Sequence, residues 1–349
     1  MRTVKIALVV LLALAALGPS TEAQSSLPIS LFERYVESLR RQTGIPGMSA
    51  AIVQDGRLAW DKGFGYQDVA GLVAAAADTP YPILDLSQTL SATVLLQQCV
   101  DFSHLELTDR VLRWDPEYPD DGTTVAQLLS HASPSDGFHY DAFRFAALTR
   151  VLEQCASDRY PRLLADEILN RLGMSQSVPG ADLGDGSSPS RQLFSSTTLD
   201  RYTAVLDRQA VPYSVDSLGR PTRSDTPIGV LTASTGVVST VRDLARFDAA
   251  LGDGVLLESG TLSRAWEPVG SMPTGLGWFV QSHRGERIVW HFGLAPNAYS
   301  SLVIKVPGRG LTLILLANSD GLAGPPYNLS DGSITSNLFA SLFLGLFVG

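Results

Sequence analysis

Residues 48–68, MSAAIVQDGRLAWDKGFGYQD, contain the pattern that decides the fold. Apolar and polar residues alternate around the pair Asp55-Gly56. Such a pair is typical of a type I′ turn, because both of its residues must adopt a positive φ, and this turn joins antiparallel strands. The stretch therefore predicts a β-hairpin. The preceding residues 30–44, SLFERYVESLRRQTG, place Leu31, Tyr35 and Leu39 at helical spacing before a terminating glycine, which predicts an amphipathic helix.

The C-terminal part of the chain holds a second group of strand patterns. The segments TGLGWFVQSH (274–283), GERIVWHFG (285–293) and YSSLVIKVPGRGLTLILLANS (299–319) predict three or four further strands, joined by turns at 284–285 and 307–310. The apolar tail SNLFASLFLGLFVG (336–349) is shorter than the roughly 20 residues that span a bilayer, so we expect a helix packed on the sheet.

Helical patterns fill the region between the two strand groups. They lie at about 86–102, 123–131, 143–154, 160–172 and 240–251, whereas 176–235 is rich in Ser, Pro, Gly and Asp and is expected to form long loops. The fold class predicted is α+β: an antiparallel sheet flanked by N- and C-terminal helices, with an inserted all-helical domain. Within one domain at 24–349, we expect a sheet sub-domain at about 24–80 and 255–349 and a helical sub-domain at about 81–254.

Residues 1–23 predict the compartment. A basic start, a short apolar core and a small-residue site before Gln24 are typical of a cleaved signal peptide, which predicts a secreted or periplasmic protein. A retained membrane anchor is the alternative, but the apolar run is shorter than about 20 residues, so no stable membrane span is expected after cleavage. The net charge of -9, without a block of Lys or Arg, argues against nucleic-acid partners. We expect a monomer.

The cysteines and histidines predict neither a disulfide framework nor a metal site. Cys99 and Cys155 lie in apolar, helix-like runs, so buried free thiols are favoured over a single disulfide. The histidines are scattered, and neither a CxxC nor an HExxH motif occurs, so no metal and no cofactor are expected.

A series of segments in fixed order carries a family resemblance. They are GIPGMSAAIVQDGRLAWDKGFGYQDV (44–69), LELTDRVLRW (105–114), TVAQLLSHAS (124–133), EILNRLGM (167–174), STGVVSTVRDLARFDAAL (234–251), and WHFG (290–293) followed by SSLVIKVPGRGLTLILLANSDG (300–321). Together they resemble the serine β-lactamase and penicillin-binding-protein superfamily, specifically its class C-like β-lactamase-related serine hydrolases and D,D-peptidases. The resemblance implies acyl transfer, in which a serine attacks a carbonyl, a lysine three residues later holds its proton, and a backbone pocket stabilises the oxyanion.

The first family motif, S-x-x-K, is degenerate here. Aligned without gaps on YPILDLSQTLSA (81–92), the resemblance puts Asp85 at the nucleophile position and Gln88 at the lysine position. Ser87 is the alternative nucleophile, but that register needs a slip of two residues and puts Leu90 where the base should be. A serine hydroxyl without a base is a poor nucleophile at neutral pH. D-x-x-Q is also close to a capping box, so we expect Asp85 to cap the following helix and Gln88 to reach back.

Two further motifs are partly retained. In the family's Y-x-N motif, the resemblance matches Tyr140, but Ala142 stands at the asparagine position and cannot hydrogen-bond through its side chain. A buried aromatic without a catalytic role is the alternative interpretation of Tyr140. In the H-x-G form of the third motif, His291 and Gly293 match, while Phe292 replaces the usual small or hydroxyl residue.

These replacements lead to two hypotheses. The first is a catalytically impaired homologue of serine hydrolases that acts as a binding or scaffold protein, for a cell-wall peptide or a small-molecule ligand, because groups that act as a unit fail as a unit. The second is a hydrolase of amide or ester bonds, with a β-lactam, a D-Ala-D-Ala peptide or an ester as substrate. It would use Ser87 or a rewired site in which Asp85, Tyr140 and His291 activate a water.

Overall fold

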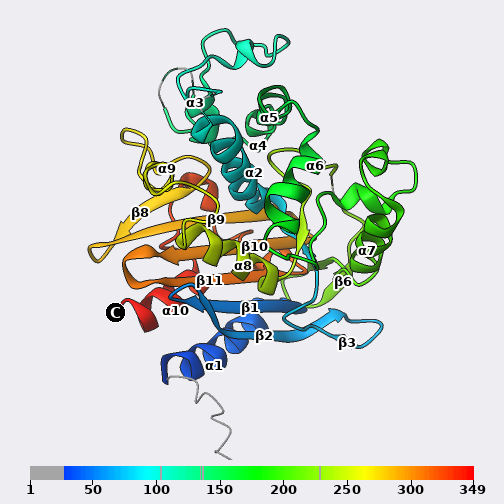
Figure 1. Cartoon of the computed structure of the whole chain (residues 1–349). Helices are drawn as coiled ribbons and strands as arrows, with labels where there is room; N and C mark the ends of the chain where they lie inside the picture. The colour runs from blue at the N-terminus through cyan, green and yellow to red at the C-terminus, as the bar shows by residue number, and fades with distance from the viewer. Residues whose placement is uncertain (1–26, 103, 134, 136, 228) are drawn as a thin grey trace, which may run out of the picture.

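A computed structural model describes residues 27–349, apart from residues 103, 134, 136 and 228 (Figure 1). The predicted signal peptide at 1–23 lies outside the described residues. At the centre is a seven-stranded sheet in the order β3-β2-β1-β11-β10-β9-β8, with every pair of neighbours antiparallel. Its strands are β1 (Gly47–Gln54), β2 (Arg57–Asp68), β3 (Val73–Ala74), β8 (Phe279–His283), β9 (Glu286–Ala295), β10 (Tyr299–Val306) and β11 (Leu311–Ala317).

The sheet joins the two ends of the chain, as the sequence predicts. Strand β1 pairs with β2 on one side and with β11 on the other, so that Ala51 lies opposite Ile314. The turn between β1 and β2 has φ values of 50° at Asp55 and 71° at Gly56, which confirms the predicted hairpin with two positive φ angles. The predicted α+β fold with a segment inserted between the two strand groups is therefore confirmed.

The terminal helices α1 (Leu27–Gln42) and α10 (Leu338–Phe347) pack together against one face of the sheet. The rings of Phe32 and Phe343 meet edge to face, with centroids 6.3 Å apart. The predicted helix α1 is confirmed, and Leu39 of its predicted apolar stripe packs against the core, but Tyr35 is 49% exposed. The buried residues of the helix are instead Ile29, Phe32 and Val36. Two apolar rows run along this helix one residue apart, and the aromatic packing against α10 selects the row that contains Phe32.

The other face of the sheet is covered by α8 (Val241–Gly252), which packs on β1, β2 and β11 (Figure 1). Helix α2 (Ser87–Leu95) shares one core cluster with α8, β10 and β11. The other helices between the two strand groups are α3 (Val125–Leu129), α4 (Ala142–Ala146), α5 (Leu148–Ala156), α6 (Tyr160–Leu164), α7 (Ser196–Leu206) and α9 (Ser259–Ala265). We expected long loops throughout residues 176–235, but part of this segment is helical and part forms strands. Helix α7 buries Tyr202 and Val205, and β5 (Tyr213–Val215) pairs with β6 (Pro221–Arg223).

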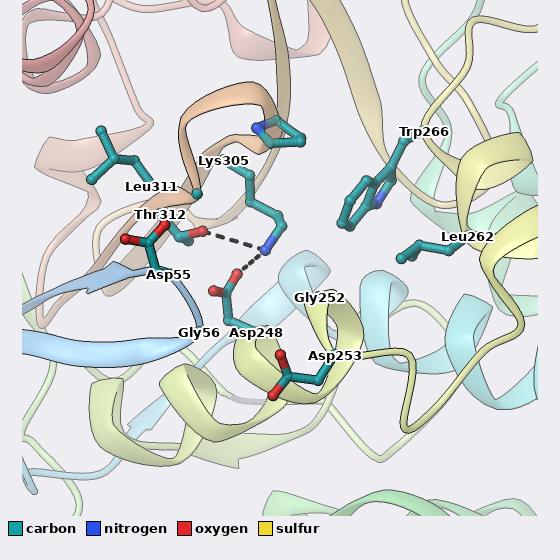
Figure 2. A pocket seen from close by; sticks show the side chains of 12 residues that line it. Asp55, Gly56, Asp248, Gly252, Asp253, Leu262, Trp266, Lys305, Leu311 and Thr312 are labelled. Carbon is teal, nitrogen blue, oxygen red and sulfur yellow. Dashed lines mark hydrogen bonds and ion pairs between the residues drawn. The ribbon is translucent and has the colours of Figure 1, made fainter.

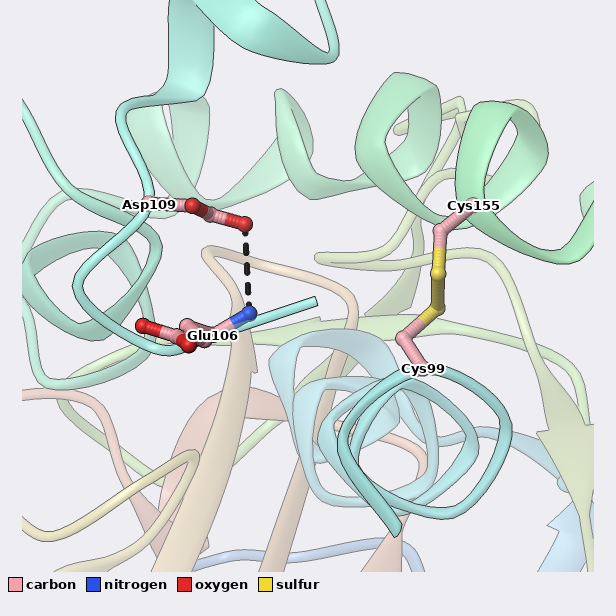
Figure 3. The surroundings of a disulfide bond; sticks show 4 residues. All are labelled: Cys99, Glu106, Asp109 and Cys155. Atoms are coloured by element: carbon pink, nitrogen blue, oxygen red, sulfur yellow. Dashed lines mark hydrogen bonds between the residues drawn. A yellow bond between two sulfur atoms is a disulfide. The ribbon is translucent and has the colours of Figure 1, made fainter. Parts of the chain in front are cut away.

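The two cysteines form a disulfide, so the favoured interpretation as free thiols was wrong (Figure 3). Cys99 lies in the π-helical extension of α2, Leu96–Asp101, and Cys155 lies in α5. The two helices pack together and bring the Cα atoms to 6.0 Å across 56 residues of sequence. This spacing falls within the range that a disulfide needs, and a sequence separation cannot show it.

Within the described residues, none of the helices combines the length and apolarity that crossing a lipid bilayer requires.

Candidate functional site

Asp85 lies in a single 3₁₀ turn, Leu84–Leu86, directly before α2. The turn rests on β9 and β10, where the Ser301 hydroxyl donates a hydrogen bond to the carbonyl of Ile83 over 2.7 Å. The preceding backbone is strained, because Leu84 has a φ of 57°, a left-handed conformation that branched residues rarely adopt. Strained backbone of this kind is often found at functional sites.

Gly293 is the residue of β9 that lets this turn approach the sheet. A Cβ atom at position 293 would lie 2.3 Å from the Ile83 carbonyl oxygen and 2.5 Å from the Ser301 hydroxyl. A side chain therefore cannot be placed here without moving the turn that carries Asp85.

Gly293→Ala should therefore destabilise the protein by about 2 kcal/mol or more, because backbone must move to admit the methyl group. Gly260→Ala in α9 is the matched control, since a Cβ there meets nothing within 4 Å. Urea unfolding of the two variants checks this. Equal stability of both variants would contradict the close approach of β9 to the turn.

The predicted capping box at Asp85 and Gln88 was wrong. Helix α2 begins at Ser87, and neither the 3₁₀ turn nor α2 has a side-chain cap. Gln88 is fully buried, and its amide contacts other parts of the chain rather than its own helix start. The Gln88 amide thus forms hydrogen bonds with residues far away in the sequence instead of the local hydrogen bonds of a capping box.

Gln88 is the centre of a hydrogen-bonded network. Its Nε2 donates to the Ser234 hydroxyl over 3.0 Å and to the Tyr140 hydroxyl over 3.3 Å. Its Oε1 lies 2.8 Å from Nε2 of His131. Ser234 was not singled out from the sequence, although it opens one of the segments that carry the family resemblance. The amide at the predicted lysine position is thus engaged at both of its ends.

His131 fixes the orientation of that amide. The backbone N–H of Asp141 donates to Nδ1 of His131 over 3.2 Å, so Nδ1 must be an acceptor. Burial lowers the pKa of His131 well below its usual value, and the ring is neutral. The proton of a neutral ring then lies on Nε2, which donates to Oε1 of Gln88. Sequence reasoning gave His131 no role, although the segment TVAQLLSHAS pointed to its neighbourhood.

Tyr140 comes next in this series, because its hydroxyl accepts from Gln88, and hydrogen bonding with this hydroxyl lowers the pKa of the Asp85 carboxyl. Burial raises the pKa of Tyr140 well above its usual value, and the adjacent Asp85 charge adds to the effect. Tyr140 therefore keeps its proton at neutral pH and cannot act as a base. The hydrogen bonds run in one direction from the start of α4 through His131, Gln88 and Tyr140 to Asp85.

Asp85 is the titratable end of this network. Burial raises the pKa of its carboxyl to about 7, although the hydrogen bond from Tyr140 acts in the opposite direction. The residue as a whole is half-buried. Among the described residues, no Lys or Arg forms an ion pair with it. A carboxyl of this kind changes its charge near neutral pH.

His291 and Phe292 belong to an aromatic cluster beside Tyr140. The ring centroid of Tyr140 lies 5.3 Å from that of Phe292 and 5.7 Å from that of Phe279. His291 is buried, and its Nδ1 lies 2.8 Å from the carbonyl oxygen and 2.9 Å from the backbone nitrogen of Phe292. Burial lowers its pKa to about 4, so this ring is neutral as well. The imidazole is thus bound to its own strand, while the Phe292 ring packs under Tyr140.

The other predicted site residues lie at the edges of this arrangement. Ser87 is completely buried, and its hydroxyl faces the backbone N–H of Val237 at 3.4 Å. Ala142 is the first residue of α4, after the N-cap Asp141. The structure thus brings Asp85, Gln88 and Tyr140 together, whereas the Ser87 hydroxyl points to a different segment.

Tyr140 also lines a surface pocket of about 470 Å³, together with Phe138, His139, Ser330 and Asp331. A separate pocket of about 290 Å³ lies between the Asp55-Gly56 turn, the end of α8 and the turn after β10 (Figure 2). There the Lys305 ammonium donates to Asp248 and Thr312. None of the predicted site residues lines this second pocket. In the part of the chain that the structure describes, no group of three or more His, Cys, Asp or Glu side chains could hold a metal ion.

A family model described as Beta-lactamase matches residues 32–328, and the chain belongs to this family. Its relatives include a penicillin-binding protein of Bacillus subtilis (strain 168), which is 22% identical over 76% of this chain and 67% of its own length. Protein flp of Staphylococcus aureus (strain MW2) is 24% identical over 78% of this chain, which spans only 60% of that protein.

Solved structures show the same fold. The D-amino acid amidase from Ochrobactrum anthropi SV3, complexed with L-phenylalanine amide, superimposes with a TM-score of 0.69 at 19% identity. The match covers 91% of this chain and 98% of the amidase. The predicted superfamily and its fold are therefore confirmed.

Proposed function

We propose that this β-lactamase-family protein does not perform serine acyl transfer and acts as a binding or scaffold protein. The observation that carries the proposal is the engagement of Gln88 by His131, Tyr140 and Ser234 at the predicted lysine position. An amide held in this way cannot take a proton from a nucleophile. The predicted serine position holds Asp85, so the nucleophile is absent as well as the base, and acyl transfer needs both the serine and the lysine.

The hydroxyl groups of the site supply no substitute. Ser234 accepts a hydrogen bond from an amide, and Tyr140 keeps its proton. Ser87 is buried, and its hydroxyl accepts from the backbone N–H of Val237. Among the described residues, the Ser234 and Ser87 hydroxyls hydrogen-bond to no side chain that could remove their protons, and an unassisted hydroxyl is a weak nucleophile.

Covalent labelling with a fluorescent penicillin tests the proposal, together with turnover of a chromogenic cephalosporin and a p-nitrophenyl ester. We expect no covalent label and no turnover above that of buffer. A label that disappears in Ser87→Ala would overturn the proposal and establish Ser87 as the nucleophile.

A second candidate is a hydrolase in which ionised Asp85 activates a water. The observation that favours it is a carboxyl that titrates near neutral pH and is oriented by Tyr140. Ester turnover that rises through about pH 7 and is lost in Asp85→Asn would support this candidate over the first. Among the described residues, no hydrogen bond joins His291 to Asp85 or Tyr140, so this candidate does not include His291.

We also propose that the protein is secreted or periplasmic. The disulfide between Cys99 and Cys155 supports this, because such bonds persist in oxidising compartments and are rare in the cytosol.

A further inference from the structure

The pocket shown in Figure 2 lies apart from the residues that align with the family motifs. It has a volume of about 290 Å³, and four parts of the chain line it: the turn between β1 and β2, the end of α8, the end of α9, and the turn between β10 and β11. This volume is close to the lower end of the range for small-molecule sites, which is about 300–1,000 Å³. The pocket therefore has room for a molecule of about one six-membered ring.

A buried ion pair lines this pocket. Lys305 and Asp248 are 5% and 8% exposed, and the Lys305 ammonium donates to Asp248 and, over 3.3 Å, to the Thr312 hydroxyl. An ammonium has three N–H groups, and among the described residues no third group accepts from it. Lys305 is also the only donor to Asp248 in the described part of the chain. A ligand that reaches this pair can therefore accept one hydrogen bond and donate another.

Trp266, which follows α9, brings a second donor without an acceptor to the same pocket. The residue is 9% exposed, and the Lys305 ammonium lies 5.3 Å from the centroid of its ring. The indole N–H of Trp266 is buried and has no hydrogen-bond acceptor within the described residues. A buried donor without an acceptor is unfavourable, and an acceptor atom on a ligand would relieve it. Together with Leu262, the Trp266 ring gives the pocket an apolar wall.

The exposed rim of the pocket is negatively charged. Asp55 and Asp253 are both exposed, and they lie beside the same glycine: Asp55 precedes Gly56, and a Cβ atom at Gly56 would lie 3.3 Å from Oδ1 of Asp253. Neither carboxylate forms an ion pair with a Lys or Arg of the described chain. Asp253 also stands at the C-terminal end of α8, which carries a partial negative charge. The rim therefore favours a cationic group and disfavours a carboxylate.

We propose that this pocket binds a small amine that carries several hydroxyl groups, such as a single amino sugar. Hydroxyl groups both donate and accept, so they can accept from Lys305 and Trp266 and donate to Asp248. The ammonium group then lies at the rim, beside Asp55 and Asp253. This pocket contains none of the positions that align with the acyl-transfer motifs, so the inference goes beyond the proposed function and is independent of penicillin labelling.

Calorimetric titration of the purified protein with four ring compounds of similar size tests the inference, at about pH 6, where an amine is protonated. Glucosamine carries both hydroxyls and an ammonium, glucose lacks the ammonium, cyclohexylammonium lacks the hydroxyls, and glucuronate carries a carboxylate instead. We expect glucosamine to bind most tightly, glucose about threefold or more weakly, and cyclohexylammonium about tenfold or more weakly. Glucuronate should not bind, because it meets the carboxylates at the rim.

Two variants separate the hydroxyl contacts from the charge. Trp266→Phe keeps a ring but removes the indole N–H, so it should weaken glucosamine and glucose alike, by about fivefold. Trp114→Phe is its control, because it removes another buried indole N–H without a partner, from a residue that does not line this pocket. Asp253→Asn should weaken glucosamine and leave glucose unchanged. Asp331→Asn, at an exposed carboxylate of the pocket beside Tyr140, is the control for net charge and should change neither affinity.

Three results would overturn the inference. The first is equal affinity for cyclohexylammonium and glucosamine, which would show attraction by charge alone. The second is no binding of glucosamine by the folded protein, and the third is unchanged binding of glucosamine in a folded Trp266→Phe variant. If Trp266→Phe does not fold, as circular dichroism can show, Asp253→Asn decides at the surface: glucosamine binding that this variant leaves unchanged would overturn the inference as well.

Discussion

The triple variant Asp85→Ser, Gln88→Lys, Ala142→Asn should be labelled covalently by a fluorescent penicillin, whereas the unmodified protein should not. The change returns a hydroxyl, an amine and an amide to three positions that the structure places around Tyr140 or at the start of α4. His131 favours the gain: its Nε2–H now points at Gln88 and would point at the new lysine, where it can be accepted only by a neutral amine. A neutral amine is the form that a base requires.

Two further variants make this result specific. Asp85→Ser alone should remain unlabelled, because its hydroxyl has no base. A second triple variant, Asp85→Ser, Gln88→Met, Ala142→Asn, should also stay unlabelled, because methionine is an unbranched side chain like lysine but has no amine. If the first triple variant is folded, as near-UV circular dichroism can show, and yet stays unlabelled, then the assignment of these positions to the acyl-transfer motif is wrong.

The stability of Asp85→Asn, measured relative to the unmodified protein, should increase as pH rises. The pKa of Asp85 is raised from 3.8 to about 7 in the folded protein, so between these values the folded state holds a proton that the unfolded state has lost. The free energy of unfolding therefore falls as pH rises through this window, by at most about 1.4 kcal/mol per pH unit, and is level above about pH 7. The asparagine does not titrate, so the variant lacks this decline.

Urea unfolding near pH 5 and near pH 8 measures this effect. The stability of Asp85→Asn relative to the unmodified protein should increase by about 2 kcal/mol or more between the two conditions. Asp253→Asn, at an exposed carboxylate, should show no such increase. A stability difference for Asp85→Asn that does not change with pH would show that the carboxyl is solvated as in the unfolded chain.

The sheet was predictable because its signals are local. The Asp55-Gly56 pair predicts a turn, and the alternation of apolar and polar residues predicts the strands on either side. The N-terminal and C-terminal strand groups then combine in one sheet, in which β1 lies beside β11. The stripe of α1 was not predictable, since Tyr35 and Phe32 belong to equally regular rows and the tertiary partner Phe343 selects between them. The disulfide depends in the same way on how α2 and α5 pack.

The sequence predicted several residues of the site but not the hydrogen bonds that join them. Asp85, Gln88 and Tyr140 follow from the family motifs, and the structure brings them into one network. His131 and Ser234 could not be chosen from the sequence, because their role depends on contacts made across 43 and 146 residues. The capping box failed for the same reason, since a local pattern says nothing about distant partners that compete for the same side chain.

The pairing of β1 with β11 has a consequence for the synthesis of the protein. Gln54 pairs with Leu311 and Met48 with Ala317, so these central strands of the sheet can pair only after residues 311–317 have been synthesised. Closing a loop of this length is entropically unfavourable until the final strands contribute their contacts. In a nascent chain, the β1 edge that faces β11 therefore stays unpaired until residues 311–317 have been synthesised.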